Sequence, residues 1–262
     1  RRQRQMCIRD SPATSALSAT SGTFSTDLTV SGNTGIGETS PLGKLHIKSG
    51  DSGASSVNAN ANELVIENSD YTGMTILGEN ESNICFGDNE DPDVGRIEYH
   101  HSDNSMRFMT NTNNAMHIDS TGAITKPNQP AFLVRPASTQ SNIALNTANT
   151  VVFGTEIFDQ NADFASNTFT APVTGKYLLA YSLYVTTLDT AANYYESYLN
   201  TSNRIYYSTI DPGFGGADFS YFSFNITAIA DMDANDTVDV KFYQSVGTAQ
   251  TDISASSHFS GC

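Results

Sequence analysis

The stretch GKYLLAYSLYV (175–185) decides the fold class. On a β-strand, alternate side chains point to opposite faces. One face of this stretch carries five apolar or aromatic side chains, namely Tyr177, Leu179, Tyr181, Leu183 and Val185. The other face carries Leu178, Ala180, Ser182 and Tyr184, and it is also partly apolar. A strand with two such faces is buried on both. We therefore expect it to lie between the core of its own domain and a subunit interface.

Short alternating runs continue on both sides of this stretch and predict an all-β protein. FSFNITAIA (222–230) alternates in the same way, and Gly, Asn and Asp separate the runs. Five runs in the first half each predict a short strand ending in a polar turn: ELVIENS (63–69), MTILGEN (74–80), NICFGDN (83–89), GRIEYHHSDN (95–104) and SMRFMTNTNN (105–114). Strands this short bury one face only, so we expect them to stack against symmetry mates.

The distribution of aromatic residues divides the chain. After Pro130 there are 11 Phe and 10 Tyr, out of 14 Phe and 12 Tyr in all. A core that stands alone needs such residues, so we expect the first half to gain its burial from partner chains in a homotrimer. We predict a shaft entry with short β units (12–34), a β-rich fibre shaft (35–127) and an aromatic-rich head (128–262).

The segment SGNTGIGETSPLGKLHIKSG (31–50) resembles a motif that recurs in phage tail fibres and related trimeric virion proteins. The motif reads Gly-Ile-Gly, Thr-Ser-Pro and Lys-Leu-His. The stretch from Glu63 to Thr125 resembles the shaft of marine phage tail fibres. Some bacterial surface proteins carry the same motif, and the alternative is a generic β-turn with glycine at positive φ.

The second half resembles the C1q/tumour-necrosis-factor-like domain. The family's Phe-Thr-Ala-Pro-x-x-Gly-x-Tyr pattern and its later turn and closing strand fall on Phe169, Thr170, Ala171, Pro172, Gly175, Tyr177, Asp236, Phe259 and Gly261. Asn235 stands where the family has glycine, and no collagen-like repeat precedes the domain. The resemblance implies a trimeric jelly-roll β-sandwich. Because the family has a few more residues after this point, we expect the head to be truncated at Cys262.

The chain's charge argues against nucleic-acid partners. It has 13 Lys+Arg and 28 Asp+Glu, a net charge of −15. Four of those cations and one of the anions lie in RRQRQMCIRDS (1–11), which leaves 9 cations against 27 anions, or −18, in the remainder. A body this acidic repels phosphate backbones and anionic membrane surfaces. No run approaches the ~20 apolar residues of a membrane span, so we expect no membrane insertion.

Residues 1–11 differ from the rest of the chain. Back-translated, they closely resemble the adapter DNA used to prepare sequencing libraries. We predict that this segment is non-biological and carries no function. The three cysteines (Cys7, Cys85 and Cys262) show no metal-site spacing and do not form a disulfide scaffold.

One segment has acids spaced like the start of a calcium loop. ADMDANDTVD (230–239) carries Asp231, Asp233 and Asn235. It lacks the glycine and the glutamate that complete an EF-hand, so a solvated hairpin turn is the favoured alternative. Calcium is the only cofactor that we consider, and we predict no catalytic residues, since no nucleophile elbow or triad signature is present.

The segment NTSNRIYYSTIDPGFGGADF (200–219) is the candidate receptor-binding tip. We expect a long loop that presents Arg204, Tyr206, Tyr207, Asp211 and Phe214. Loops on rigid β scaffolds carry recognition, and Tyr beside Gly and Asn is typical of adaptable binding surfaces. The alternative is that Tyr206 and Tyr207 are strand residues, one of them in the core.

Together these patterns predict a non-enzymatic attachment protein. The resemblance implies a phage tail fibre in the virion, whose head binds a host-cell surface glycan or protein and whose shaft joins other tail or virion proteins. Two alternatives remain: a bacterial secreted or cell-surface adhesin with the same head, and a glycan depolymerase carried on a fibre.

Overall fold

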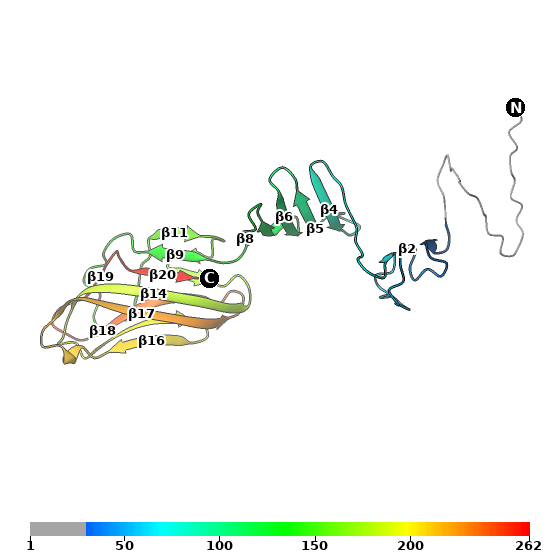
Figure 1. Cartoon of the computed structure of the whole chain (residues 1–262). Helices are drawn as coiled ribbons and strands as arrows, with labels where there is room; N and C mark the ends of the chain where they lie inside the picture. Colours follow the sequence, from blue (N-terminus) through cyan, green and yellow to red (C-terminus); the bar gives the residue numbers. More distant parts are fainter. Residues whose placement is uncertain (1–29) are drawn as a thin grey trace, which may run out of the picture. The chain divides into compact units, whose positions relative to one another are not determined.

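The computed structural model describes residues 30–262 (Figure 1). The all-β prediction is confirmed: these residues form 20 strands and one short 3-10 turn. None of the helical structure in residues 30–262 has the length and apolar character needed to span a membrane. The predictions for residues 1–11 and 12–29 lie outside the described residues.

The chain divides into two compact units, the first ending at Ile76 and the second spanning Leu77–Cys262. The predicted boundary between shaft and head, at 127/128, falls inside the second unit and stays a prediction. Cys85 and Cys262 are free and exposed.

The first unit contains a three-stranded parallel sheet. Its strands, in sheet order, are β1 (Thr34–Ile36), β2 (Leu45–Lys48) and β3 (Leu64–Glu67). The chain leaves β1 through Gly37, whose φ of +75° is a conformation that favours glycine. The buried side chains of this sheet are the charged or polar His46 and Glu67 rather than hydrophobic ones. The described part of this unit, residues 30–76, therefore has no apolar core within one chain.

A five-stranded antiparallel meander follows. Its strands are β4 (Glu81–Phe86), β5 (Gly95–His100), β6 (Ser105–Thr110), β7 (Asn113–Ile118) and β8 (Ile124–Thr125). Asn111 and Thr112, both at positive φ, form the two-residue turn between β6 and β7. Such primed turns match the right-handed twist of the strands. Four of the five short strands predicted in the first half of the chain are thus confirmed: β3 in the parallel sheet, and β4, β5 and β6 in the meander.

The strand predicted at 74–80 is wrong, because residues 74–78 form no ladder. Met74 and Leu77 are exposed there, so nothing in the described chain covers their apolar side chains. The meander buries a carboxylate instead of an apolar cluster: Glu98 lies 2.9 Å from Arg96 Nε and 3.2 Å from Arg107 Nη1.

Residues 132–262 form a sandwich of two antiparallel sheets with a jelly-roll-like strand order (Figure 1). The first sheet, here the β14 sheet, has the order β11-β9-β20-β14-β17, and β19 also pairs with β14. Its strands are β9 (Phe132–Arg135), β11 (Thr155–Asp159), β14 (Gly175–Leu188), β17 (Phe219–Met232), β19 (Asp252–Ile253) and β20 (His258–Gly261).

The second sheet, here the β15 sheet, has the order β12-β13-β18-β15-β16, and β10 also pairs with β18. Its strands are β10 (Asn149–Thr150), β12 (Phe164–Ala165), β13 (Thr168–Thr170), β15 (Tyr194–Thr201), β16 (Ile205–Ile210) and β18 (Thr237–Ser245). The 3-10 turn η1 (Pro212–Phe214) follows β16.

All the buried hydrophobic residues of the described chain lie between Phe132 and Phe259. The face of β14 that carries Tyr177, Leu179, Tyr181, Leu183 and Val185 is the one buried in this core. Its other face is not buried within one chain, because Leu178 is 45% exposed and Tyr184 is half-buried. Phe169, Tyr177 and Phe259, three of the residues that match the family motif, lie in the core.

Two of the family-motif positions are glycines, and packing requires glycine at only one of them. A Cβ on Gly261 would lie 2.7 Å from Phe132 and 2.8 Å from Leu179, so only glycine fits there. A Cβ on Gly175 would meet only an ordinary contact with Tyr177, so packing does not require glycine at that position. Pro172 is half-buried just before β14.

The buried carboxylate of Asp189 ties two loops of the sandwich together. The N–H groups of Ala191 and Ala249 donate to it at 2.8 and 2.7 Å, and the N–H of Thr248 donates as well. Burial alone would raise the pKa of Asp189, but these backbone donors outweigh it and hold the pKa below its ordinary value of 3.8.

We expect Asp189→Asn to destabilise the sandwich by about 1–3 kcal/mol, because an amide NH2 would then face N–H donors. The lowered pKa means that the carboxylate stabilises the fold above its ordinary pKa and loses this effect as pH falls through the folded value. Urea unfolding at neutral and acidic pH measures both effects. The difference in unfolding free energy between the variant and the wild type should become smaller at low pH. Asp218→Asn, an exposed carboxylate that binds Thr190 of the same loop, is the matched control. Equal losses in the two variants would contradict the argument.

Candidate functional site

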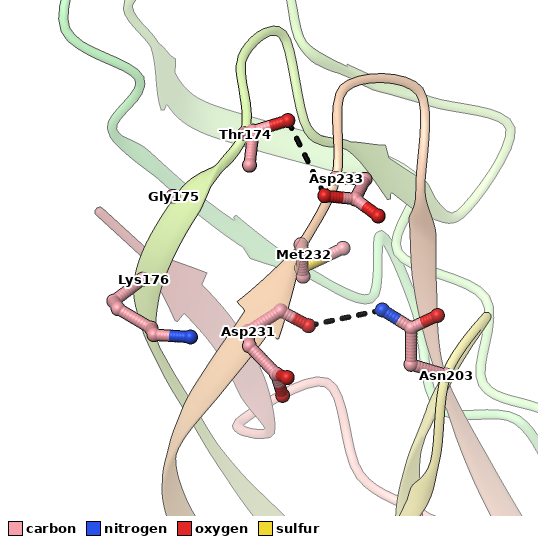
Figure 2. A pocket seen from close by; sticks show the side chains of 7 residues that line it. All are labelled: Thr174, Gly175, Lys176, Asn203, Asp231, Met232 and Asp233. Carbon is pink, nitrogen blue, oxygen red and sulfur yellow. Dashed lines mark hydrogen bonds between the residues drawn. The ribbon is translucent and has the colours of Figure 1, made fainter.

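A cavity of about 260 Å³ opens at the end of the sandwich where β14 begins and β17 ends (Figure 2). The ladder between these strands places Gly175 opposite Met232 and Lys176 opposite Asp231. The cavity is lined by Thr174, Gly175, Lys176, Asn203, Asp231, Met232 and Asp233. Three separate turns therefore supply its walls, and the buried Met232 gives it an apolar residue.

The polar groups of the cavity are held in place by their neighbours. Asn203 donates from Nδ2 to the backbone oxygen of Asp231 (3.1 Å) and to Asp236 Oδ2 (2.7 Å). Thr174 Oγ1 donates to Asp233 Oδ1 at 3.4 Å (Figure 2). Arg204 Nη2 lies 2.9 Å from Asp231 Oδ2. The site thus presents fixed hydrogen-bond acceptors, namely the oxygen atoms of Asp231, Asp233 and Asn203.

The turn at 233–236 explains why the chain folds this way locally. Asp236 Oδ2 accepts from the N–H of Asp233 at 2.8 Å, and the N–H of Asp236 donates back to the Asp233 backbone oxygen at 3.0 Å. Asn235 sits between them with φ of +73°, a conformation that asparagine tolerates better than most residues. This accounts for asparagine at a position where the resembling family has glycine.

The structure brings together three residues that the sequence nominated for two different roles. Arg204, a receptor candidate, pairs with the calcium candidate Asp231, and Asp233 lies beside them. Asn235 is exposed on the turn. The guanidinium already offsets the charge of Asp231, so a cation here would have to compete with Arg204. Calcium binding stays a prediction.

Another cluster has the side chains of a metal site. In residues 30–262, Glu38, His46 and Glu67 are the one set of three with ligand atoms close enough to share an ion. Lys48 Nζ lies 2.9 Å from Glu38 Oε2 and 3.6 Å from Glu67 Oε2, and the Glu38 carboxylate raises the pKa of Lys48 to about 12. The ammonium of Lys48 thus supplies positive charge to these carboxylates, and we assign the cluster a structural role.

The remaining receptor candidates do not form one surface. The segment 200–219 is not the single long loop that the sequence predicted, because Ile205–Ile210 is strand β16. Arg204 precedes this strand, and Asp211 and Phe214 follow it. Six strand residues span about 20 Å, so the two ends of the segment lie far apart.

The two tyrosines of β16 point in opposite directions. Tyr206 packs against the core, whereas Tyr207 is 55% exposed and lies against Tyr198. Phe214 is 71% exposed and contacts Phe219, and Asp211 caps η1 by accepting from the N–H of Gly213 at 2.9 Å. The alternative interpretation, two strand tyrosines with one toward the core, therefore describes this segment.

Sequence reasoning missed Thr174, Lys176 and Asn203. They lie in turns far apart along the chain, and no local pattern marks them. Only the pairing of β14 with β17, and the return of the chain after β15, brings them to one cavity.

Comparison with known proteins gives similarity of fold. No sequence family matches this chain, and no curated protein does so by sequence. Among solved structures, the globular domain of zebrafish complement 1qA protein is 15% identical over 51% of this chain and 96% of its own, with a TM-score of 0.36. Murine APRIL is 14% identical over 50% of this chain and 95% of its own, with a TM-score of 0.37. We therefore argue function from the residues of this chain.

We expect Tyr206→Ala to cost about 1–3 kcal/mol of unfolding free energy, since it removes a ring packed on the core. Substituting the neighbouring Tyr207 (Tyr207→Ala) or the exposed Phe214 (Phe214→Ala) should in each case lower the unfolding free energy by less than about 1 kcal/mol. Thermal and urea unfolding of the three single variants measure this. If Tyr207→Ala proves as costly as Tyr206→Ala, the assignment of the two ring orientations is wrong.

Proposed function

We propose that this chain is a non-enzymatic attachment protein whose head binds a glycan or protein on a host-cell surface. The observation that carries the proposal is the cavity at 174–176, 203 and 231–233. Its acids and amide are held in place by neighbouring groups, and their oxygen atoms are rigid acceptors for a polar ligand, whereas Lys176 can donate to it. A carboxylate committed to an ion pair, as Asp231 is with Arg204, suits binding better than proton transfer.

The setting that we favour is a phage tail fibre, on the resemblance of residues 31–50 and 63–125 to fibre shafts. A virion location and contacts with other tail or virion proteins are parts of this proposal. A bacterial secreted or surface adhesin would use the same head. The genes that neighbour the gene for this chain decide between the two, since tail and baseplate genes accompany a fibre.

We further propose that the chain is a homotrimer. Leu178 (45% exposed) and Ile229 (69% exposed) are directly opposed on the outer face of the β14 sheet. On the same face, six residues further along β14, Tyr184 stacks on Tyr221 with ring centroids 5.7 Å apart. The shaft segment exposes Phe86 and Leu77. Exposed apolar side chains of this kind are covered when copies associate. Three weak sites on one stem would add avidity without new contacts.

A protein of residues 12–262 should sediment as a trimer, because association buries the exposed apolar side chains on the outer face of the β14 sheet and on the shaft segment. Analytical ultracentrifugation at micromolar concentration measures this. Ile229→Asp should shift the population toward monomer, whereas Thr209→Asp, on the outer face of the other sheet, should not. A well-folded monomer in the unsubstituted protein would rule out the trimer.

We expect the labelled chain to bind a subset of a panel of bacteria, measured by flow cytometry. Asn203→Ala with Asp231→Ala should reduce this binding at least about tenfold, because both groups that fix the cavity are removed. Asp218→Ala, a loop carboxylate outside the cavity, is the control. If the double variant folds and binds equally, the cavity is not the attachment site. If the chain degrades capsule with turnover, the fibre-borne depolymerase is the correct function.

A further inference from the structure

The outer face of the β15 sheet carries four tyrosines, here called the tyrosine face: Tyr194, Tyr198, Tyr207 and Tyr243. They come from three neighbouring strands, β15, β16 and β18. Their chain neighbours Tyr195, Leu199 and Phe242 are fully buried in the core. Strand alternation therefore fixes these four rings on the outside of the sandwich.

The rings form two close pairs. Tyr194 and Tyr243 stack with centroids 5.7 Å apart and planes at 24°. Tyr198 and Tyr207 are directly opposed across β15 and β16, with centroids 5.0 Å apart. Tyr194 and Tyr198 are four residues apart on one strand, so the pairs are separated by about 13 Å along it. The face thus offers two aromatic surfaces in a row.

Polar groups lie between and beside these pairs. Asn200 Nδ2 donates to Asp239 Oδ1 at 2.9 Å, and Lys241 Nζ contacts Asp239 Oδ2 and Thr150 Oγ1, each at 2.6 Å. Glu196 projects between Tyr194 and Tyr198 on the same face. Within residues 30–262 its carboxylate makes no hydrogen bond or ion pair, so it is a free acceptor.

The phenols of Tyr194 and Tyr198 remain hydroxyl donors at neutral pH. Burial, and then the neighbouring Tyr207, raise the pKa of Tyr198, and the hydrogen bond with Tyr243 raises the pKa of Tyr194. These titrations accordingly lie above the neutral range. The tyrosine face therefore combines flat rings with hydroxyl, amide and carboxylate groups.

We infer that the tyrosine face binds a neutral glycan. Aromatic rings offer a flat apolar surface with a polar edge, which suits the C–H faces and hydroxyls of sugar rings. Glu196 and the phenols are placed to hydrogen-bond those hydroxyls. The face itself carries two carboxylates (Glu196 and Asp239) and one ammonium (Lys241), on a chain of net charge −15. An acidic glycan would be repelled by this negative charge, whereas an uncharged glycan would not.

This inference rests on the proposed function, because it names the ligand class for attachment and adds a site apart from the cavity. The outer faces of two packed sheets point in opposite directions. The tyrosine face thus stays open when the outer face of the β14 sheet is covered in a trimer.

The test is retardation of the full chain in native gels that contain a neutral polysaccharide, with a mannan, a galactan and a β-glucan as separate probes and alginate as the acidic comparison. We expect retardation by at least one neutral probe and none by alginate. Tyr198→Ala with Tyr207→Ala should weaken it at least about tenfold. Tyr207→Phe, which keeps the ring, should retain most of it, as should the control Tyr71→Ala in the first unit.

Several outcomes would overturn the inference. One is that no neutral probe retards the chain, and another is that the folded double variant is retarded as much as the unsubstituted chain. A third is that the double variant sediments differently from the unsubstituted chain, which would make the tyrosine face an interface between copies. Flow cytometry separates the two proposals. If the chain binds cells but binds none of the neutral polysaccharides, the attachment function stands and the tyrosine-face inference fails. If the chain binds neither cells nor glycans, both fail.

Discussion

The contact of Phe132 with Phe169 and Phe259 is the interaction on which the sandwich depends. Phe132 stacks on Phe169 at 4.9 Å and meets Phe259 edge-on at 4.9 Å. Phe132 and Phe259 belong to the β14 sheet and Phe169 to the β15 sheet, so the cluster joins the two sheets across the core. It also leaves no room for a side chain at position 261. Burial of large aromatic rings is a major source of stability in a domain of this size.

Every surface with a proposed role follows from that packing. Once one side of each strand is committed to the core, the alternate side chains are forced outward. On the β14 sheet this exposes Leu178 and Ile229, and on the β15 sheet it exposes the tyrosine face. The cavity lies at the end of the sandwich, where Asp231 and Asn203 meet from different turns. Assembly and recognition can therefore occupy different surfaces of one head.

The sheets between Thr34 and Thr125, which we propose form a shaft, obey a different constraint. These sheets are too small to enclose an apolar core, and their buried side chains are the charged or polar His46, Glu67, Glu98 and Ser105. A buried carboxylate is tolerated only when cations or hydrogen bonds compensate it. Arg96 and Arg107 do so for Glu98, and Lys48 lies close to Glu67. Apolar side chains such as Phe86 are left exposed, which is why we assign their cover to neighbouring copies.

The sequence by itself determined the all-β class, the apolar alternation of β14 and most of the short strands, because alternation and turn residues are local signals. It also indicated the turn at Asp233–Asp236. It could not place Asn203 or Lys176 at the cavity, since their neighbours come from distant strands. It treated 200–219 as a loop, although pairing with β15 makes Ile205–Ile210 a strand. The spacing of Tyr194 and Tyr198 was visible in the sequence, but Tyr207 and Tyr243 join them only through strand register. Register is a long-range property, and only the tertiary structure decided it.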